Sequence, residues 1–548
     1  MRIVNYLIEK KINLNAVPGS HNLPLYEAGE KSSDLKIISW RTEYGACNGA
    51  LGAAKAMGNP EIIVSIAGPG ITSFTTAIGE AYFESVPLIC IGVNNFKVDL
   101  DVEKGLIHEM PDSRGLFDPI TVVSVRAETE EQLANMIYHS VEKGREIAKP
   151  IYIEAPSDVF SAIFENNTVI TMGNNILEDY LLEDDNEIEK IVEKCAEKLK
   201  QASLPVIHVG WGGQLSDVHE ELIEICENCG VMVIPTIRAK GILEENNAYN
   251  AGPIWERARQ VTEIAEKSDL VIAVGTRLSM LNTRGGTLPI NGDLYHIVND
   301  PKYFGITYPK AENLKCDCKK FLKLLSEKVK EQKNEARCEK VKTIVSSIKE
   351  QWDSKLEEKI PAVSKLMKDI KEAYDDDTHF VMDMCQEGYW LSRYIHANKR
   401  MTFQSSFYFG TLGPSIPMAI GASNSRNGNV VAICGDGGFI YGFNELASAK
   451  KYGIPIKILL FNNNRFDAII RAHQARYKNE SNHYQLYNPD FKGISDAFEI
   501  NYYKTNYKEI KNTICKANKE STSYIIEVIS DDIPMFNSIK WEDLNLKL

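Results

Sequence analysis

The sequence predicts an α/β protein made of three doubly wound parallel-sheet domains, and two features of the chain support this prediction. Its 548 residues exceed what one hydrophobic core can serve, so two to four domains of roughly 100–200 residues are expected. Short β-branched runs alternate with helical patterns throughout, which is typical of parallel sheets covered by helices on both faces. Polar and charged stretches divide these runs into three blocks, which we place at residues 1–165, 185–335 and 355–548.

The first block contains the clearest alternation of strand and helix. A buried strand is predicted at Glu61–Ala67, a helix at Thr72–Glu84 and a second strand at Pro87–Val93. The following stretch, Asn174–Glu189, is rich in Asn, Glu and Asp. Its composition is typical of a linker to the second block.

The second and third blocks repeat this pattern. The second resembles a dinucleotide-fold domain, with strands predicted at Pro205–Gly210, Val231–Ile234 and Leu270–Val274. A Lys- and Glu-rich helical region, Lys319–Glu358, is predicted to bridge to the third block. The first and third blocks share one strand–loop–helix–strand plan, and the strands of the third are predicted at Phe380–Met382, Val430–Cys434, Ile456–Phe461 and Tyr524–Val528.

The composition is that of an ordinary soluble globular protein, and the charge favours a small-molecule substrate. The chain is 44% hydrophobic and 25% charged, with a formal charge of −13, so phosphate backbones and anionic lipid are poor partners. No stretch approaches a membrane span and the N-terminus lacks an apolar signal region, so a cytoplasmic location is expected. The 11 cysteines suit reduced, buried thiols. A zinc site is a minor alternative, at Cys226 and Cys229 with Cys316 and Cys318.

A glycine-rich segment at the end of one predicted strand has the features of a diphosphate site. Val430–Cys434 runs into Gly435-Asp436-Gly437-Gly438, where glycines are expected to allow a tight turn and close approach to an anion. A helix is predicted at Asn444–Tyr452, and the next strand ends at Asn463. Because neighbouring parallel strands end at one sheet edge, Asp436 and Asn463 are expected to meet there and to suit Mg²⁺. Taken alone, the glycine-rich segment is equally typical of a β-turn.

The combination GDGGF, then EL-x-x-A, then NNN resembles the diphosphate motif of thiamine-diphosphate-dependent enzymes, in the superfamily of acetolactate synthase, pyruvate oxidase and benzoylformate decarboxylase. The resemblance extends over essentially the whole chain. It implies thiamine diphosphate and Mg²⁺ as cofactors, with Asp436, Asn463 and the Arg465 carbonyl as metal ligands. Many relatives have a serine where this chain has Gly438. The other third-block residues implied to bind the cofactor are Gln386, Glu387, Gly435, Gly437 and Phe466.

The same resemblance implies an activating glutamate in the first block, and Glu43 occupies that position. It precedes a segment rich in Gly and Ala, whose weak helix propensity makes sense where another helix approaches closely, as at a subunit interface. Without the other motifs, Glu43 could simply be a charge favoured by the helix dipole. In the family this carboxylate bonds the aminopyrimidine ring and promotes proton transfer within the folded cofactor.

Further positions are implied to shape the cofactor and its surroundings. Leu412 is the candidate wedge between the two cofactor rings, with the Gly410 carbonyl facing the amino group, although a plain core leucine is the common alternative. Gly68 and Gly70 also match the family. Because Glu43 lies in the first block and the diphosphate motif in the third, the family arrangement implies a homodimer or tetramer with active sites between subunits.

The predicted reaction is decarboxylation of a 2-oxo acid followed by coupling of the fragment to a second carbonyl, as in acetolactate synthase. Simple decarboxylation with release of an aldehyde is the near alternative, and a catalytically silent binding or regulatory subunit is a third. Residues that distinguish pyruvate decarboxylases and acetolactate synthases are absent, and a flavin is not expected because the segment after Gly252 lacks the family's flavin pattern. The candidate substrate-handling residues are Ser20, His21, Glu109 and His473.

Overall fold

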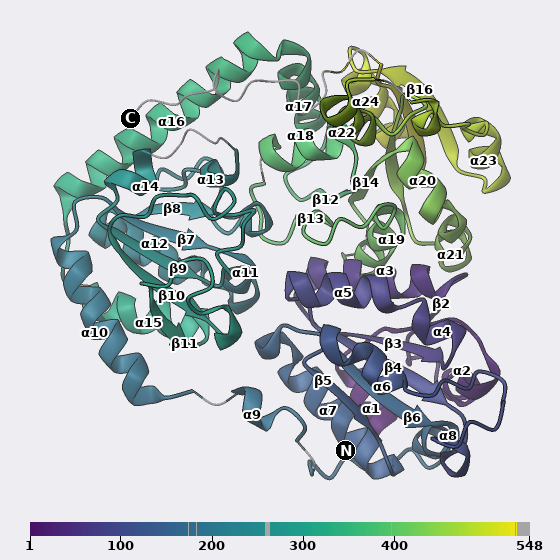
Figure 1. Ribbon diagram of the computed structural model, residues 1–548. Helices are drawn as coiled ribbons and strands as arrows, with labels where there is room; N and C mark the ends of the chain where they lie inside the picture. Colours follow the sequence, from purple (N-terminus) through teal and green to yellow (C-terminus); the bar gives the residue numbers. More distant parts are fainter. Residues whose placement is uncertain are drawn as a thin grey trace.

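The computed structural model confirms three α/β domains, each built on one parallel β-sheet (Figure 1). The structure describes residues 1–173, 175–181, 183–257, 263–395, 397–426, 428–479, 481–531 and 533. Within these ranges, none of the helices combines the length and apolar character that crossing a bilayer requires.

The first domain has a six-stranded sheet covered by helices on both faces. The strands lie in the order β2 (Ile37–Ser39), β1 (Leu14–Ala16), β3 (Glu61–Ile66), β4 (Leu88–Asn94), β6 (Ile151–Pro156) and β5 (Val123–Arg126). The helices are α1 (Ile3–Glu9), α2 (Leu23–Lys31), α3 (Glu43–Met57), α4 (Pro69–Thr72), α5 (Thr75–Glu84), α6 (Ser113–Phe117), α7 (Glu130–Ile147) and α8 (Ser157–Glu165).

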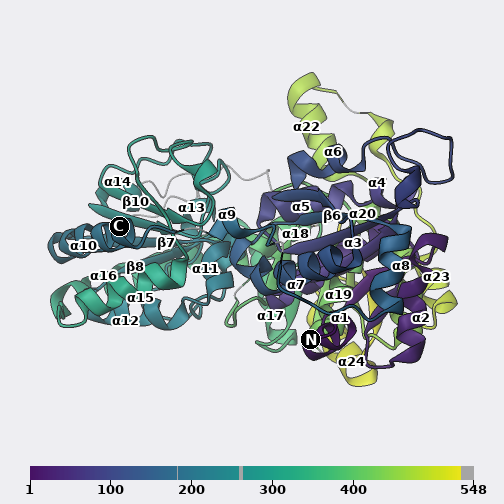
Figure 2. The ribbon, with the colours of Figure 1, turned by 90° about the horizontal axis from the view of Figure 1, so that it is seen from below.

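The central domain has a five-stranded sheet and lies to one side of the other two domains when the molecule is seen from below (Figure 2). Its strands lie in the order β11 (Glu312–Lys315), β10 (Asp293–Val298), β9 (Leu270–Val274), β7 (Pro205–Val209) and β8 (Met232–Pro235). The helices of this region are α9 (Glu178–Leu181), α10 (Asp185–Gln201), α11 (Trp211–Ser216), α12 (His219–Cys229), α13 (Ile254–Arg257), α14 (Glu263–Lys267) and α15 (Cys318–Val329).

The third domain repeats the strand order of the first, which confirms the shared plan predicted for these two blocks. Two helices, α16 (Glu335–Lys359) and α17 (Pro361–Ala373), lead into it. The strands lie in the order β13 (Phe403–Ser405), β12 (His379–Met382), β14 (Val430–Gly435), β15 (Lys457–Asn462), β17 (Tyr524–Ile529) and β16 (Asn501–Asn506). The helices are α18 (Gln386–Tyr394), α19 (Ser415–Arg426), α20 (Asp436–Gly442), α21 (Leu446–Tyr452), α22 (Asp467–Tyr477), α23 (Phe491–Ala497) and α24 (Ile510–Glu520).

Alternate residues of the first sheet face two different cores. Ile62 and Val64 of β3 belong to a core covered by α1, α2, α7 and α8, whereas Ile63 belongs to a core that contains α3 and α5. This second core continues into the third domain, where Ile420 of α19 and Ile458 of β15 are part of it. Burial of each such side chain contributes about 1.5–3 kcal/mol. The first and third domains are therefore stabilised by one shared apolar core.

The close approach predicted for the Gly- and Ala-rich helix is present, but its partner lies in the same chain. Helix α3 packs against α19, and the two lie side by side between the first and third domains (Figure 1). A Cβ atom at Gly421 would lie 1.9 Å from the Gly49 carbonyl oxygen, and one at Gly52 would lie 2.1 Å from the Met418 carbonyl oxygen. The small residues thus allow backbone contact between domains of one chain.

Several expected element boundaries need correction. The predicted linker Asn174–Glu189 contains α9 and the start of α10, whose first turn is capped by the side chain of Asp184. The acidic residues there cap and begin a helix, a role that composition alone does not distinguish from a linker. The predicted helix Thr72–Glu84 begins later, as α5 at Thr75, and the separate short helix α4 ends at Thr72. The helix predicted at Asn444–Tyr452 is present as α21, which begins at Leu446. A further helix, α20, precedes it and begins at Asp436.

Candidate active site

The predicted site residues gather at the carboxyl edges of the first and third sheets, where parallel α/β folds place their ligands. In the third domain they follow four strands that lie beside one another. Gln386 and Glu387 follow β12, Gly410 and Leu412 follow β13, Gly435–Gly438 follow or end β14, and Asn463, Arg465 and Phe466 follow β15. All eleven of these predicted residues line one cavity of about 210 Å³. The sheet thus brings the third-block candidates together.

Asp436 is a buried carboxylate held by three donors. The backbone N–H of Gly437 donates to Oδ1 over 2.8 Å, and the N–H of Asn464 donates to Oδ2 over 2.7 Å. The side-chain amide of Asn488 also donates to Oδ2, over 2.8 Å. Burial raises the pKa of Asp436 while these hydrogen bonds oppose the rise. The carboxylate is therefore oriented before any ligand binds.

Asn463 and Arg465 share a partner beside Asp436. The Asn463 amide nitrogen donates to Asp467 Oδ2 over 2.6 Å, and Arg465 Nε donates to Asp467 Oδ1 over 2.5 Å. Because the amide nitrogen of Asn463 is engaged, its oxygen is the atom that can face a cation. Burial also raises the pKa of Glu387 to about 7, so near neutral pH this side chain can donate a proton to a phosphate oxygen.

The glycines of the diphosphate segment do not form the tight turn expected from the sequence. None of Gly435, Gly437 and Gly438 has a positive φ angle, and α20 begins directly at Asp436. Their role is close packing instead. A Cβ atom at Gly437 would lie 2.3 Å from the Phe466 ring, and one at Gly438 would lie 3.1 Å from the Asp383 carboxyl group. A serine at position 438 would therefore crowd Asp383, which is consistent with the glycine found here.

The cavity fits a magnesium-bound diphosphate in its chemistry but is small for a whole cofactor. One carboxylate, one amide oxygen and a backbone carbonyl are hard oxygen ligands of the kind that Mg²⁺ uses together with phosphates and water. Within the described residues, no cluster of three or more His, Cys, Asp and Glu side chains is arranged for a metal, and this oxygen set does not need one. A volume of about 210 Å³ is below the roughly 300–1,000 Å³ typical of sites that enclose a small ligand.

Glu43 lies at the carboxyl edge of the first sheet, where it begins α3 after β2 as predicted. The preceding Thr42 caps the helix by accepting a hydrogen bond from Gly45 N–H over 2.9 Å. Both residues before Glu43 are fixed by Glu445 of the third domain, whose buried carboxylate accepts from Arg41 N–H, Thr42 N–H and Thr42 Oγ1. Glu43 is half-buried and does not line the third-domain cavity of its own chain.

Four other first-domain candidates lie along the same edge. Ser20 and His21 follow β1, and Gly68 and Gly70 follow β3. The His21 ring packs edge-on against His108, with ring centroids 5.5 Å apart, and a Cβ atom at Gly68 would lie 3.1 Å from the His108 backbone. Burial and the neighbouring His108 lower the pKa of His21.

Glu109 and His473 have structural partners in this chain. The Glu109 carboxylate accepts hydrogen bonds from the backbone N–H groups of Lys104, Gly105 and Leu106, so it shapes its own loop. His473 lies on α22, which projects from the body of the molecule (Figure 2), and it contacts the Tyr484 hydroxyl and the Asn479 side chain. Neither lines the cavity, and their roles toward substrate stay predictions.

Three residues of this region were not assigned a role from the sequence. Glu445 positions the start of α3, and it is the glutamate of the EL-x-x-A motif, so that motif carried a signal for it. Asp383 is fully buried and accepts hydrogen bonds from Gly413 N–H and Ser415 Oγ, which fixes the loop that carries Leu412. His108 pairs with His21, a contact between distant segments that the sequence did not predict.

Comparisons with known proteins agree with this arrangement. Three family descriptions match in chain order: thiamine pyrophosphate enzyme, N-terminal TPP binding domain, at residues 7–116; its central domain, at 192–325; and its C-terminal TPP binding domain, at 383–528. The chain belongs to the thiamine pyrophosphate enzymes. The expected family and enzyme class are thereby confirmed, with thiamine diphosphate as the cofactor of the family.

The relatives that the chain resembles are named for two different reactions. The chain is 30% identical to the protein named "Probable 2-ketoarginine decarboxylase" of Pseudomonas aeruginosa, over 83% of this chain and 79% of the relative. It is 26% identical to the "Acetolactate synthase large subunit" of Corynebacterium glutamicum, over 92% of this chain and 82% of the relative. It is also 26% identical to the "Probable acetolactate synthase large subunit" of Methanocaldococcus jannaschii, over 94% and 88%.

Proposed function

We propose that this thiamine pyrophosphate enzyme decarboxylates a 2-oxo acid with the help of Mg²⁺. The observation that carries the proposal is that Asp436, Asn463 and Arg465 line one cavity at the ends of the third-domain strands. Bound there, thiamine diphosphate supplies the electron sink that a 2-oxo acid needs to lose carbon dioxide. A catalytically silent subunit is the weaker alternative, because Glu43, Asp436 and Asn463 are all present.

The residues of this chain have separate tasks in the proposed reaction. Asp436, Asn463 and the Arg465 carbonyl would hold Mg²⁺, and Glu387 would donate toward a phosphate oxygen. Glu43 would accept a hydrogen bond from the aminopyrimidine ring and stabilise its proton-accepting form. Leu412 would fill the space between the two rings and keep water from the reacting carbon.

We further propose that the active unit is a homodimer, or a tetramer made of two such dimers. The cavity is lined by third-domain residues among those described, and Glu43 of the same chain is not one of them. A second copy would supply a first-domain edge with Glu43. Large apolar side chains are exposed on both domains, including Phe83, Ile440, Tyr441 and Ile469, and a partner would cover them.

After carbon dioxide leaves, the fragment can be protonated or coupled to a second carbonyl. The His21–His108 pair favours protonation, because it places two imidazole rings that can pass a proton from water to the fragment at the edge that carries Glu43. Release of an aldehyde is therefore the outcome that the geometry supports best, in line with the decarboxylase among the relatives. Coupling, which the sequence favoured, is the second candidate, and its support is the kinship with acetolactate synthases.

The two outcomes can be separated by product analysis. Purified protein with thiamine diphosphate and Mg²⁺ is given a panel of 2-oxo acids that includes pyruvate and 2-ketoarginine, with and without an acceptor aldehyde. Carbon dioxide release measures the first step, and the ratio of aldehyde to hydroxyketone measures the second. Absence of carbon dioxide release from every member of a broad panel, with cofactor bound, would contradict the proposed reaction.

Replacing both histidines tests the preferred outcome. In His21→Asn with His108→Asn, aldehyde release should fall by about 10²–10⁴-fold, the usual contribution of a positioned acid or base. Coupling to an added aldehyde should fall less, so the product ratio should shift toward the hydroxyketone. His139→Asn, which removes a histidine from α7, serves as the control. An unchanged product ratio in the double variant would argue against a proton-donor role.

A further inference from the structure

The loop that carries Leu412 packs against the first domain. This Leu412 loop, residues 406–414, connects β13 to α19 and contains Gly410 and Gly413, whose φ angles are +83° and +88°. The Gly413 N–H donates to Asp383 of the same domain over 2.9 Å. Because glycines with positive φ give a loop many backbone conformations, its shape depends on what holds the residues between and beside them.

The first domain holds the loop through α5 and the start of α3. The Phe409 ring stacks on Phe83 of α5, with ring centroids 5.6 Å apart. A Cβ atom at Gly79, one turn earlier, would lie 2.8 Å from the Phe409 ring, so glycine allows this close approach. The Tyr44 hydroxyl donates to the Leu412 carbonyl oxygen over 3.2 Å. The backbone of Leu412 is therefore attached to the first domain of its own chain.

A buried ion-pair cluster joins α3 and α5 to the start of the Leu412 loop. Lys55 of α3 is 2% exposed and lies between two fully buried carboxylates of α5, 2.7 Å from Glu80 Oε1 and 2.6 Å from Glu84 Oε2. Its ammonium group also donates to the Ser405 carbonyl at the end of β13, over 3.0 Å. The cluster therefore anchors the strand end from which the loop begins.

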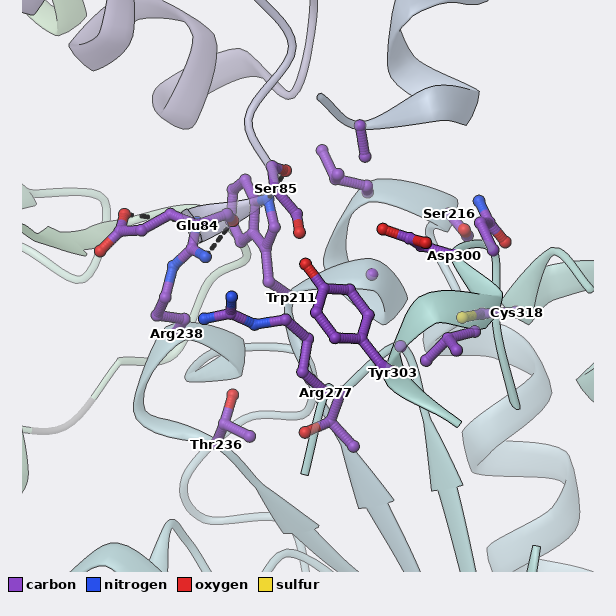
Figure 3. Close-up of a pocket in the computed structure, with 18 of the residues that line it drawn as sticks. Glu84, Ser85, Trp211, Ser216, Thr236, Arg238, Arg277, Asp300, Tyr303 and Cys318 are labelled. Carbon is purple, nitrogen blue, oxygen red and sulfur yellow. Dashed lines mark hydrogen bonds and ion pairs between the residues drawn. The ribbon is translucent and has the colours of Figure 1, made fainter. Parts of the chain in front are cut away.

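The central domain contributes a second cation to this cluster. Arg238 lies beside Glu84 (Figure 3), with its Nη2 3.7 Å from Glu84 Oε2, and its Nη1 donates to the Glu84 carbonyl oxygen. Two cations, Lys55 and Arg238, thus face two carboxylates, and the charges of the cluster balance. Lys55 contacts only the Oε1 atom of Glu80, so Oε2 is available to another donor.

Glu80 Oε2 and the Thr411 hydroxyl are two buried polar groups that have no hydrogen bond within the described part of the chain. Thr411 is 8% exposed and directly precedes Leu412. Burial raises the pKa of Glu80, while Lys55 opposes the rise. Glu84 adds to it, and the nearby Thr411 hydroxyl opposes it. Because buried polar groups without partners destabilise a protein, a small shift of the loop that joins these two is favourable.

We propose that Glu80 is a positioning residue of this enzyme: in the cofactor-bound state its carboxylate accepts a hydrogen bond from the Thr411 hydroxyl and so holds Leu412 in place. This inference rests on the proposed function, in which Leu412 separates the two cofactor rings. Glu80 is not among the residues that line the third-domain cavity, so it acts through the loop and not on the substrate. Lys55 favours the ionised carboxylate that accepts this bond.

Removal of the Thr411 hydroxyl tests the contact. In Thr411→Val, kcat should fall by about tenfold to a hundredfold, the scale expected when a group that shapes the site is slightly misplaced. KM and the affinity for thiamine diphosphate, measured by calorimetry in Mg²⁺, should stay close to those of the wild type. Thr411→Ser keeps the hydroxyl and should recover most of kcat. Thr343→Val, at an exposed position of α16, is the matched control.

Hydrogen exchange reports on the loop without any turnover. In the wild type, thiamine diphosphate and Mg²⁺ should protect the backbone amides of residues 406–414. This protection should be smaller in Thr411→Val and in Glu80→Gln. The double variant should lose no more kcat than the more severe single variant, because both changes remove the same contact. Thr411→Val leaves the ion pairs intact, so it decides the question even if Glu80→Gln loses stability.

The outcomes separate this inference from the proposed function. Wild-type kcat and wild-type loop protection in Thr411→Val, with cofactor bound and carbon dioxide released, would overturn the positioning role alone. Independent, additive losses of kcat in the double variant would also overturn it, because Glu80 and Thr411 would then act separately. Failure of the wild type to bind thiamine diphosphate would instead contradict the proposed function itself.

Discussion

The first and third domains have the same strand order, yet their carboxyl edges carry different chemistry. The third edge encloses a cavity in which Asp436 and Asn463 are already held by neighbouring donors and acceptors. The first edge presents Glu43 and the His21–His108 pair, and these do not line that cavity in the same chain. The shared topology places both candidate sites at strand ends, whereas the side chains differ: we propose that the third edge binds the cofactor and that the first edge transfers protons.

The largest effect should come from removing the third-domain carboxylate. In Asp436→Ala, the proposed metal loses its only charged protein ligand, so activity should fall by more than about a hundredfold and the cofactor should no longer be retained. Retention is measured as thiamine diphosphate that remains after gel filtration in Mg²⁺. Asp490→Ala, at the start of α23, is the control. If the Asp436 variant keeps cofactor and activity, the cofactor-binding role proposed for the third-domain edge is wrong.

Changing the first-domain carboxylate should separate binding from chemistry. In Glu43→Gln, turnover should be abolished or reduced by about 10²–10⁴-fold, because an amide cannot stabilise the proton-accepting form of the ring. Cofactor retention should stay close to that of the wild type. The exposed Glu27→Gln is the matched control. Full activity in Glu43→Gln would show that the first-domain edge does not carry the proposed proton-transfer role.

Glu445 connects the third domain to the first-domain edge, and its loss should weaken both the domain contact and the position of Glu43. Glu445→Ala would leave Arg41 N–H, Thr42 N–H and the Thr42 hydroxyl without their acceptor. The free energy of unfolding should fall by about 2–4 kcal/mol, measured by denaturant titration with the exposed Glu509→Ala as control. Activity at saturating cofactor should also fall, since Glu43 would lose its fixed position. Stability equal to that of the control variant would count against this role.

The smallest effect should come from the opposite edge of the first sheet. Burial raises the pKa of Glu61, at the start of β3, from 4.5 to about 8, while Asn13 and Asn15 donate to its carboxylate. The folded protein therefore binds more protons than the unfolded chain between these values, and its stability should fall as pH rises across this range. Glu61→Gln should flatten the dependence of Tm on pH without changing the pH profile of turnover. A shifted activity profile would show that this edge also takes part in catalysis.

The parts of the site that follow from local signals were predictable. The strand–helix–strand spacing placed Asp436 beside Asn463, and the helix that begins at Glu43 starts where expected. Contacts between distant segments were not predictable, because Glu445 reaches the start of α3 and His108 reaches His21 only after the domains pack. The glycines of the diphosphate segment were expected to form a turn, but they lie at the start of a helix, since glycine serves tight packing as well as unusual φ angles.

The glycine crossing of α3 and α19 has a consequence for dissecting this protein. Gly49 and Gly421 bring the two backbones into contact within one continuous core. The first domain and the third domain would therefore each expose apolar side chains if they were separated. A fragment that ends after the first domain would expose the apolar side of α3 and is expected to aggregate when expressed alone. Co-expression of the first domain with a separate chain that carries the central and third domains should instead recover soluble material, because the central and third domains share a second apolar core.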